Sequence, residues 1–124
     1  MSNYLEAALI NAVFRNTSYT SPAKVYMSLH TADPGETGAS EISAGDYVRQ
    51  EATFEVPTDG VSTNSAVIDF PVSSSDHGSI THFAIWDAST ASNCLVYGAL
   101  TTARTYNTGE FLRVPIGELS VTFA

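Results

Sequence analysis

The sequence has a single cysteine and few basic residues. Cys94 cannot close a disulfide within the chain, and one thiol does not form a zinc site by itself. Five Lys and Arg residues stand against thirteen Asp and Glu residues, and the formal net charge is −8. Because nucleic acids and anionic membranes are bound mainly through basic side chains, neither is an expected partner. The bases are also scattered rather than clustered: Arg15, Lys24, Arg49, Arg104 and Arg113.

Long apolar runs are absent as well, so we do not expect insertion into a membrane. The apolar stretches are short, and one of them, residues 94–97, begins with the cysteine. We therefore expect Cys94 to be buried as a small hydrophobic residue rather than to react. A chain without disulfides suits assembly in a reducing cytoplasm.

The motifs of common catalytic sites are missing too. The sequence contains no Gly-x-Ser-x-Gly elbow, no HExxH motif and no glycine-rich phosphate loop. His30 and His82 occupy alternating strand positions, where we expect structural roles. His77 lies in a loop rich in Ser and Asp, where we expect it to be exposed. We therefore predict no enzymatic activity and no cofactor.

The loop of residues 31–46 leaves a calcium site open as an alternative. It carries four acidic residues, and clustered carboxylates can bind calcium: Asp33, Glu36, Glu41 and Asp46. Their spacing does not follow the EF-hand pattern, and a solvated acidic loop is the simpler interpretation.

What the sequence does contain is a series of short strand patterns separated by turn signals. Strands are predicted at residues 25–30, 47–56, 66–70, 80–86, 94–100, 111–114 and 119–123. The run 80–86 is apolar on both faces, so we expect it to be covered on both sides and to form a hairpin with 94–100. The pattern predicts an all-β fold, an antiparallel β-sandwich (jelly-roll or barrel-like) of six to eight short strands. It also predicts a single domain, residues 1–124, with the sandwich in 25–124.

Residues 3–15 form the one predicted α-helix. Asn3 is the expected N-cap, with Glu6 three residues further on. The apolar residues fall on two faces of this helix, with one stripe of Leu5, Ala8, Leu9, Ala12 and Val13 and a nearly opposite pair of Ile10 and Phe14. Either one face packs on the domain and the other on a neighbouring subunit, or both are buried within one fold. The first interpretation makes this a docking helix.

Candidate contact residues follow from these patterns. Tyr26 and Tyr47 are predicted on the polar faces of their strands, and tyrosine supplies a large contact area at a small entropic cost. The full set of expected interface residues is Leu5, Leu9, Ile10, Val13, Phe14, Tyr26 and Tyr47.

Several segments resemble a family of small bacteriophage virion proteins, usually labelled phage tail fibre or minor tail proteins. The start, Met1-Ser2-Asn3-Tyr4-Leu5-Glu6, is similar to theirs. A longer similar segment is Val25-Tyr26-Met27-Ser28-Leu29-His30-Thr31-Ala32-Asp33-Pro34, followed by Gly38 and Glu41. Further segments are Tyr47-Val48-Arg49-Gln50 with Thr53-Phe54, Ile80-Thr81-His82-Phe83-Ala84-Ile85-Trp86-Asp87-Ala88, and Val96-Tyr97-Gly98-Ala99-Leu100-Thr101. The resemblance covers nearly the whole chain.

The resemblance implies a structural subunit of a phage virion, assembled in the host cytoplasm. It implies symmetric self-assembly, with a trimer suggested by the fibre label, and docking to other phage structural proteins. The family supplies no catalytic residues. Two alternatives stay open: a decoration (cement) protein on the capsid surface, and a module at the tail tip that binds a host surface glycan through loops 31–46 and 73–78.

Overall fold

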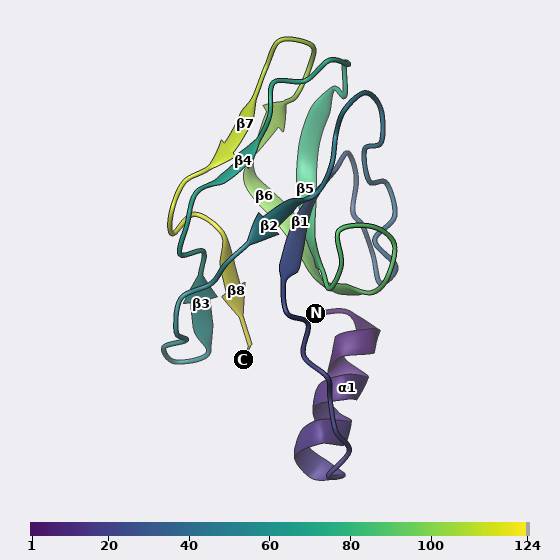
Figure 1. Cartoon of the computed structure of the whole chain (residues 1–124), viewed down its shortest axis with the longest axis vertical. Helices are drawn as coiled ribbons and strands as arrows, with labels where there is room; N and C mark the ends of the chain where they lie inside the picture. Colours follow the sequence, from purple (N-terminus) through teal and green to yellow (C-terminus); the bar gives the residue numbers. More distant parts are fainter. Residues whose placement is uncertain (124) are drawn as a thin grey trace.

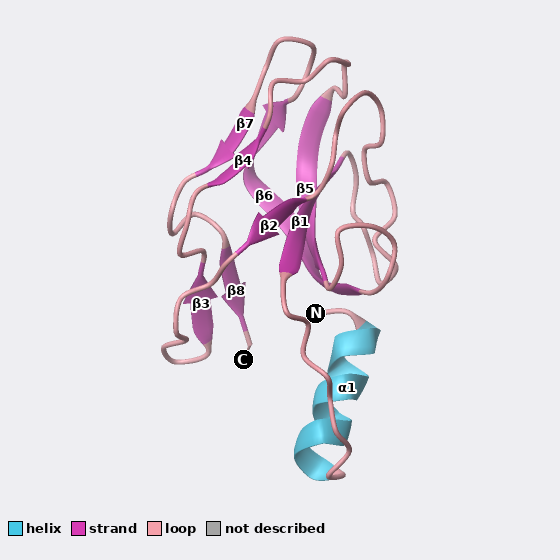
Figure 2. Ribbon diagram, in the orientation of Figure 1, coloured by secondary structure: helices cyan, strands magenta, loops and turns pink. Residues whose placement is uncertain are grey.

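A computed structural model of the protein describes residues 1–123. The helix α1 (Asn3–Phe14) comes first, and antiparallel strands make up the rest of the fold (Figures 1 and 2). The strands are β1 (Val25–His30), β2 (Gln50–Ala52), β3 (Val61–Thr63), β4 (Ile68–Phe70), β5 (Ser79–Trp86), β6 (Cys94–Thr105), β7 (Leu112–Val114) and β8 (Ser120–Thr122). The prediction of an all-β antiparallel sandwich with six to eight short strands and one N-terminal helix is confirmed for the described residues.

The strands form one larger sheet and two smaller ones. The main sheet has the order β2-β1-β5-β6, and the pairs β4-β7 and β3-β8 form two-stranded sheets beside it (Figure 1). The predicted hairpin of 80–86 with 94–100 is confirmed, because β5 and β6 pair antiparallel from Ser79↔Thr105 to Trp86↔Cys94. β5 also pairs with β1, so it is an interior strand, whereas β6 lies at the edge of the sheet.

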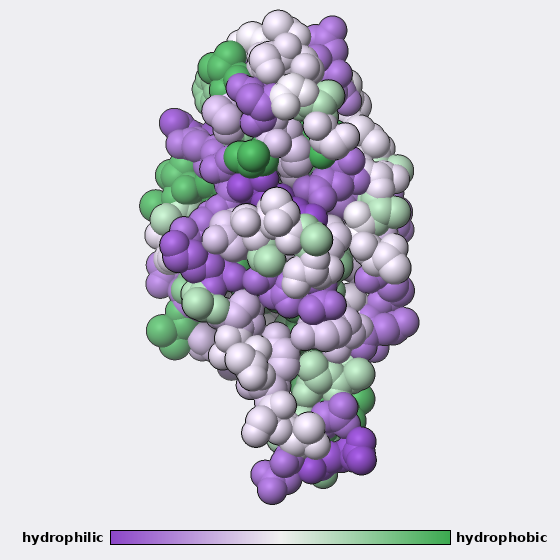
Figure 3. Space-filling view, turned by 45° about the vertical axis from the view of Figure 1, so that its right-hand side comes forward, coloured by the Kyte–Doolittle hydropathy of each residue, from purple (hydrophilic) through white to green (hydrophobic). Residues whose placement is uncertain are grey.

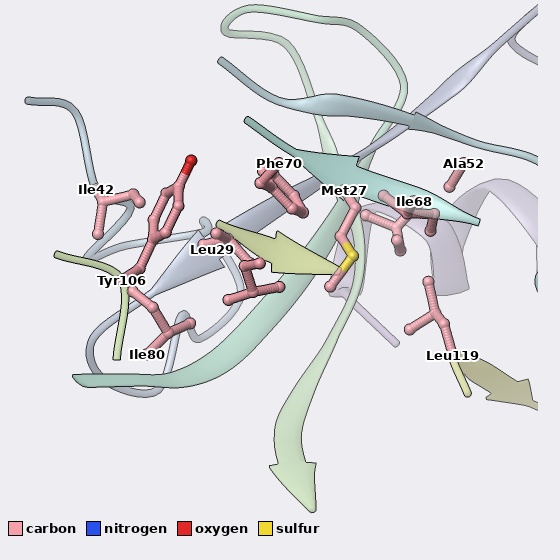
Figure 4. Packing of buried hydrophobic residues seen from close by; sticks show 11 residues of the cluster. Met27, Leu29, Ile42, Ala52, Ile68, Phe70, Ile80, Tyr106 and Leu119 are labelled. Atoms are coloured by element: carbon pink, nitrogen blue, oxygen red, sulfur yellow. The ribbon is translucent and has the colours of Figure 1, made fainter. Parts of the chain in front are cut away.

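The core fills the space between the main sheet and the small sheets. Met27 and Leu29 of β1 point toward Ile68 and Phe70 of β4, as Figure 4 shows, and all four side chains are almost fully buried. Period-two alternation in β1 produces this arrangement, because every second side chain lies on the same face. Each such buried side chain contributes roughly 1.5–3 kcal/mol relative to exposure.

The other face of the main sheet is covered by the loop of residues 31–46. Pro34 in this loop is fully buried, and Gly38 packs against the indole of Trp86 so closely that a Cβ atom has no room. The backbone of Gly38 has φ +75°, a conformation that glycine adopts without strain. The loop therefore forms a layer of the fold, while three of its four acids, Asp33, Glu36 and Asp46, are exposed, as a solvated acidic loop implies.

Two predicted strand boundaries also need correction. Within 47–56 only β2 is a strand, and the side chains of Val48 and Val56, on either side of it, are exposed. The strand β3 was not predicted. Its residues Val61-Ser62-Thr63 include a single apolar side chain, so there is no alternation to recognise.

The N-cap of the helix lies one residue earlier than predicted. Ser2, rather than Asn3, is the N-cap, and its Oγ accepts a hydrogen bond from the Leu5 amide at 3.3 Å. The same hydroxyl donates to the Cys94 carbonyl at 2.6 Å, and the Ser2 amide donates to the Leu95 carbonyl at 2.8 Å. These contacts fix the first turn of α1 to the start of β6. No helix within residues 1–123 is long and apolar enough to cross a membrane.

Candidate functional site: the helical stem and the groove beside it

Helix α1 and the returning residues 15–24 together project from the β-sandwich, and we call this projection the stem. It forms the narrow lower end of the molecule in Figures 1 and 3. The returning segment runs alongside the helix, and the Thr17 amide donates to the Asn11 carbonyl at 3.0 Å. Burial, and then the neighbouring Tyr4 and Asp87, raise the pKa of Tyr19 in this segment. The stem is thus an ordered element that is held to the body at its base.

The two apolar faces of α1 have different surroundings. Leu5 is buried and Leu9 is half-buried on the inner face. On the outer face Ile10, Val13 and Phe14 are 54%, 70% and 80% exposed, and we call these three residues the tip patch. Successive residues of a helix are 100° apart, so Val13 lies between Leu9 and Ile10 in helical projection. Its side chain is exposed, like that of Ile10, and is not buried as Leu5 is. The helix therefore presents an apolar surface that residues 1–123 do not cover.

A groove opens beside the base of the stem. Its volume is about 490 Å³, and we call it the basal groove. The lining residues come from the stem, the main sheet and the β3-β8 pair: Leu5, Val25, Phe54, Pro57, Gly60, Ser62, Ile85, Leu95, Val96, Val121 and Phe123. None of these residues carries a charge. An open apolar groove of this kind is typical of a surface that contacts another molecule.

The two tyrosines predicted as contact residues lie elsewhere. Tyr26 is half-buried and is opposite Trp86 in the register of β1 and β5. Tyr47 is packed on the core, where its ring stacks on Phe70 with centroids 6.2 Å apart. Its hydroxyl donates to Glu41 Oε2 at 2.8 Å and accepts from the Leu29 amide at 3.1 Å, and burial raises its pKa. This internal position does not fit a role of Tyr47 in a contact surface.

Sequence reasoning missed a cluster around Arg49. Its guanidinium makes two hydrogen bonds to the Glu41 carboxylate, at 2.9 and 2.8 Å, and lies 3.8 Å from the centroid of the Trp86 ring. It also donates to the carbonyls of Ala88 and Ala91, at 3.1 and 3.0 Å. The side chains of Arg49 and Glu41 are only 7% and 21% exposed. Arg49 thereby fastens two loops to the outer face of the main sheet.

The buried residues Ser28 and His30 lie next to each other and are connected to the Arg49 cluster through Trp86. The Trp86 indole donates to Ser28 Oγ at 2.7 Å, and the Ser28 hydroxyl lies 2.6 Å from His30 Nε2. His30 Nδ1 lies 2.7 Å from the Ala39 carbonyl, which only accepts, so Nδ1 carries the proton and Nε2 accepts from Ser28. Both residues are fully buried. The pair is enclosed and its polar atoms are all satisfied, which is the geometry of a structural network.

This network makes the stability of the protein depend on pH. Burial lowers the pKa of His30 from its ordinary value of 6.5 because the imidazolium ion is disfavoured in the interior. The unfolded chain therefore takes up a proton at a higher pH than the folded chain does. We expect stability to be full above pH 6.5, to fall as the pH drops toward the lower folded pKa, and to lose nothing further from this group below it.

Urea unfolding at a series of pH values from 8 to 5 measures this dependence. The variant His30→Gln removes the titrating group, so its stability is expected to change less with pH across the same window. A wild-type protein whose midpoint does not move between pH 7.5 and 5.5 would contradict this assignment of the network.

The acids of loop 31–46 do not converge on one point. Asp33 accepts from the Gly35 amide, Glu36 from the Asn3 amide and the Tyr97 hydroxyl, Glu41 from Arg49, and Asp46 from Ser74. Within residues 1–123 no group of three or more His, Cys, Asp or Glu side chains could hold a metal ion. Nothing in the described residues therefore supports a cation site in this loop.

The remaining reactive side chains have structural surroundings. Cys94 is buried as predicted, and burial raises the pKa of its thiol to about 11. His77 is half-buried rather than exposed, and its ring stacks on Tyr106 with centroids 5.1 Å apart. The prediction that His77 is exposed is therefore wrong.

Comparison with known proteins identifies one family. Residues 1–122 match the model of a family described as "Podophage GP4 fiber I protein gp80". No curated protein matches the chain.

Proposed function

Because the chain belongs to the podophage GP4 fibre I protein family, we propose that it is a tail-associated structural subunit of a bacteriophage particle. The subunit acts by assembling with copies of itself and by docking to other virion proteins. The match covers 122 of the 124 residues, so it includes the stem as well as the sandwich. The virion is the place of action, and assembly takes place in the host cytoplasm.

The observation that carries this proposal is the exposed tip patch at the end of a projecting helix. Phe14 is 80% exposed, and Ile10 and Val13 on the same face of the helix are 54% and 70% exposed. Covering apolar surface stabilises an assembly by roughly 25 cal/mol per Å². A subunit that leaves such a patch open gains stability when a partner covers it.

The family match favours a position on the tail over a position on the capsid surface. The geometry gives no separate support to the glycan-binding alternative. Loop 31–46 is fastened to the main sheet through Arg49 and Gly38, and Tyr47 stacks on the core rather than facing outward. A sugar-binding platform needs an exposed aromatic face, which these residues do not supply.

Fractionation of purified particles tests the proposal. Particles are dissociated into capsids and tails, and the amount of this chain in each fraction is measured by quantitative mass spectrometry. We expect several copies per tail and none on the capsid shell. Recovery with the capsid shell would show a decoration protein, and absence from purified particles would overturn the virion assignment itself.

A further inference from the structure

We propose that the tip patch of one copy inserts into the basal groove of a second copy of this chain. This inference rests on the proposed function, since it names the surfaces through which the subunit assembles with itself. The tip patch is exposed and the basal groove is open, and both belong to the end of the molecule from which α1 projects (Figure 1).

A chain cannot fill its own groove with its own tip patch. Leu5 lines the basal groove, and Phe14 is nine residues further along the same helix. A rise of 1.5 Å per residue places Phe14 about 13 Å beyond Leu5 along the helix axis. The first turn is fixed to β6 through Ser2, so the helix does not turn back. The groove is therefore available to a helix from another copy.

The chemistry of the two surfaces is matched. The tip patch has no charged side chain, and the groove lining has none either. Arg15 follows the tip patch directly in sequence, and the next base of the stem is Lys24. Arg15 is exposed and forms no ion pair with a described acid. The exposed acids Glu55 and Asp59 are neighbours in sequence of the lining residues Phe54 and Gly60. In the proposed contact, insertion of the tip brings Arg15 into the region of these acids.

The area of contact favours a second copy over an unrelated protein. A Phe side chain alone buries about 150–250 Å², and a stable interface needs about 800 Å² on each partner. One insertion of the tip patch falls short of that area. A copy that both gives a tip and receives one makes two such contacts, so a closed, symmetric assembly covers every patch and every groove.

Cysteine cross-linking in the full-length protein tests the contact. Chains with Ile10→Cys are coexpressed with chains that carry Val121→Cys in the groove and a tag that changes their mass. Mild oxidation is expected to link the two kinds of chain. Cys94 stays in place, because its buried thiol does not compete. Ser62→Cys serves as a second acceptor in the groove in case the Val121 variant does not fold.

The matched control pairs Ile10→Cys with Val72→Cys, an exposed apolar position outside the groove lining. The proposal requires a link from Ile10→Cys to either groove position at least tenfold more abundant than the link in this control. An oligomer that forms without that link overturns the insertion of the tip while the proposed function stands. A chain that is missing from purified tails overturns the proposed function, and a chain that remains a monomer at high concentration overturns the insertion.

Discussion

Replacing Ile10 and Phe14 by glutamate is expected to leave the β-sandwich folded and to remove the subunit from assembled particles. Both side chains are exposed in the free chain, so the cost to folding is small, up to about 1 kcal/mol from the acid near the C-terminus of the helix. In the assembly that we propose, the same positions are covered by apolar surface. Two carboxylates without partners in such a contact cost at least about 3 kcal/mol. Incorporation should fall on the order of 100-fold, since about 1.4 kcal/mol corresponds to a factor of ten.

The measurement is the amount of variant chain in particles assembled when the variant is the only copy supplied, with circular dichroism to verify the fold. A matched control replaces Val72 and Ile116, two exposed apolar residues outside the stem and the groove lining, by glutamate. The control is expected to incorporate like the wild type. Normal incorporation of the Ile10/Phe14 variant would show that the tip patch is not a contact surface.

Arg49→Met is expected to have the largest effect on stability of any single surface-loop substitution. The change removes a bidentate pair with Glu41, the contact with the Trp86 ring and two hydrogen bonds to loop carbonyls. It also leaves Glu41 without its cation at a position where the carboxylate side chain is only 21% exposed. Breaking such a buried pair costs about 3 kcal/mol. Small domains are stable by about 5–15 kcal/mol, so this loss is a large share.

Denaturant unfolding measures the loss, and a second arginine supplies the control. Arg113 pairs with Asp69 at 2.6 Å, but these side chains are 56% and 52% exposed. Arg113→Met is therefore expected to cost less than about 1 kcal/mol. Equal losses in the two variants would mean that burial of the Arg49 pair contributes nothing to the fold.

The fold class follows from sequence wherever a strand is long enough to show its period. β1, β5 and β6 were predicted because six or more residues alternate or stay apolar. β2 lies within the strand predicted at residues 47–56, which was too long, and β3 (Val61-Ser62-Thr63) has a single apolar residue and shows no such signal. The packing of loop 31–46 on the main sheet could not be predicted either, because its four acidic residues suggest a loop that is exposed to solvent. Glu41 pairs with Arg49, eight residues away, and Arg49 lies against the Trp86 ring of β5; no local sequence pattern encodes these contacts.

The candidate site divides in the same way. The two apolar faces of α1 can be recognised from the local sequence. The pattern puts Ile10 and Phe14 on the face opposite to Leu5, and in the structure these two side chains are exposed whereas Leu5 is buried. The basal groove is not local. Leu5, Phe54 and Val121 line it together, although the span from the first to the last of them exceeds 100 residues along the chain. Only the arrangement of the main sheet against the β3-β8 pair brings them to one surface.

Imaging of the intact particle by electron cryomicroscopy tests most directly whether this chain works by assembly. We predict several symmetry-related copies on the tail, each with its stem covered by a neighbouring chain. A reconstruction that places isolated copies away from the tail, with Ile10 and Phe14 facing solvent, would contradict the account.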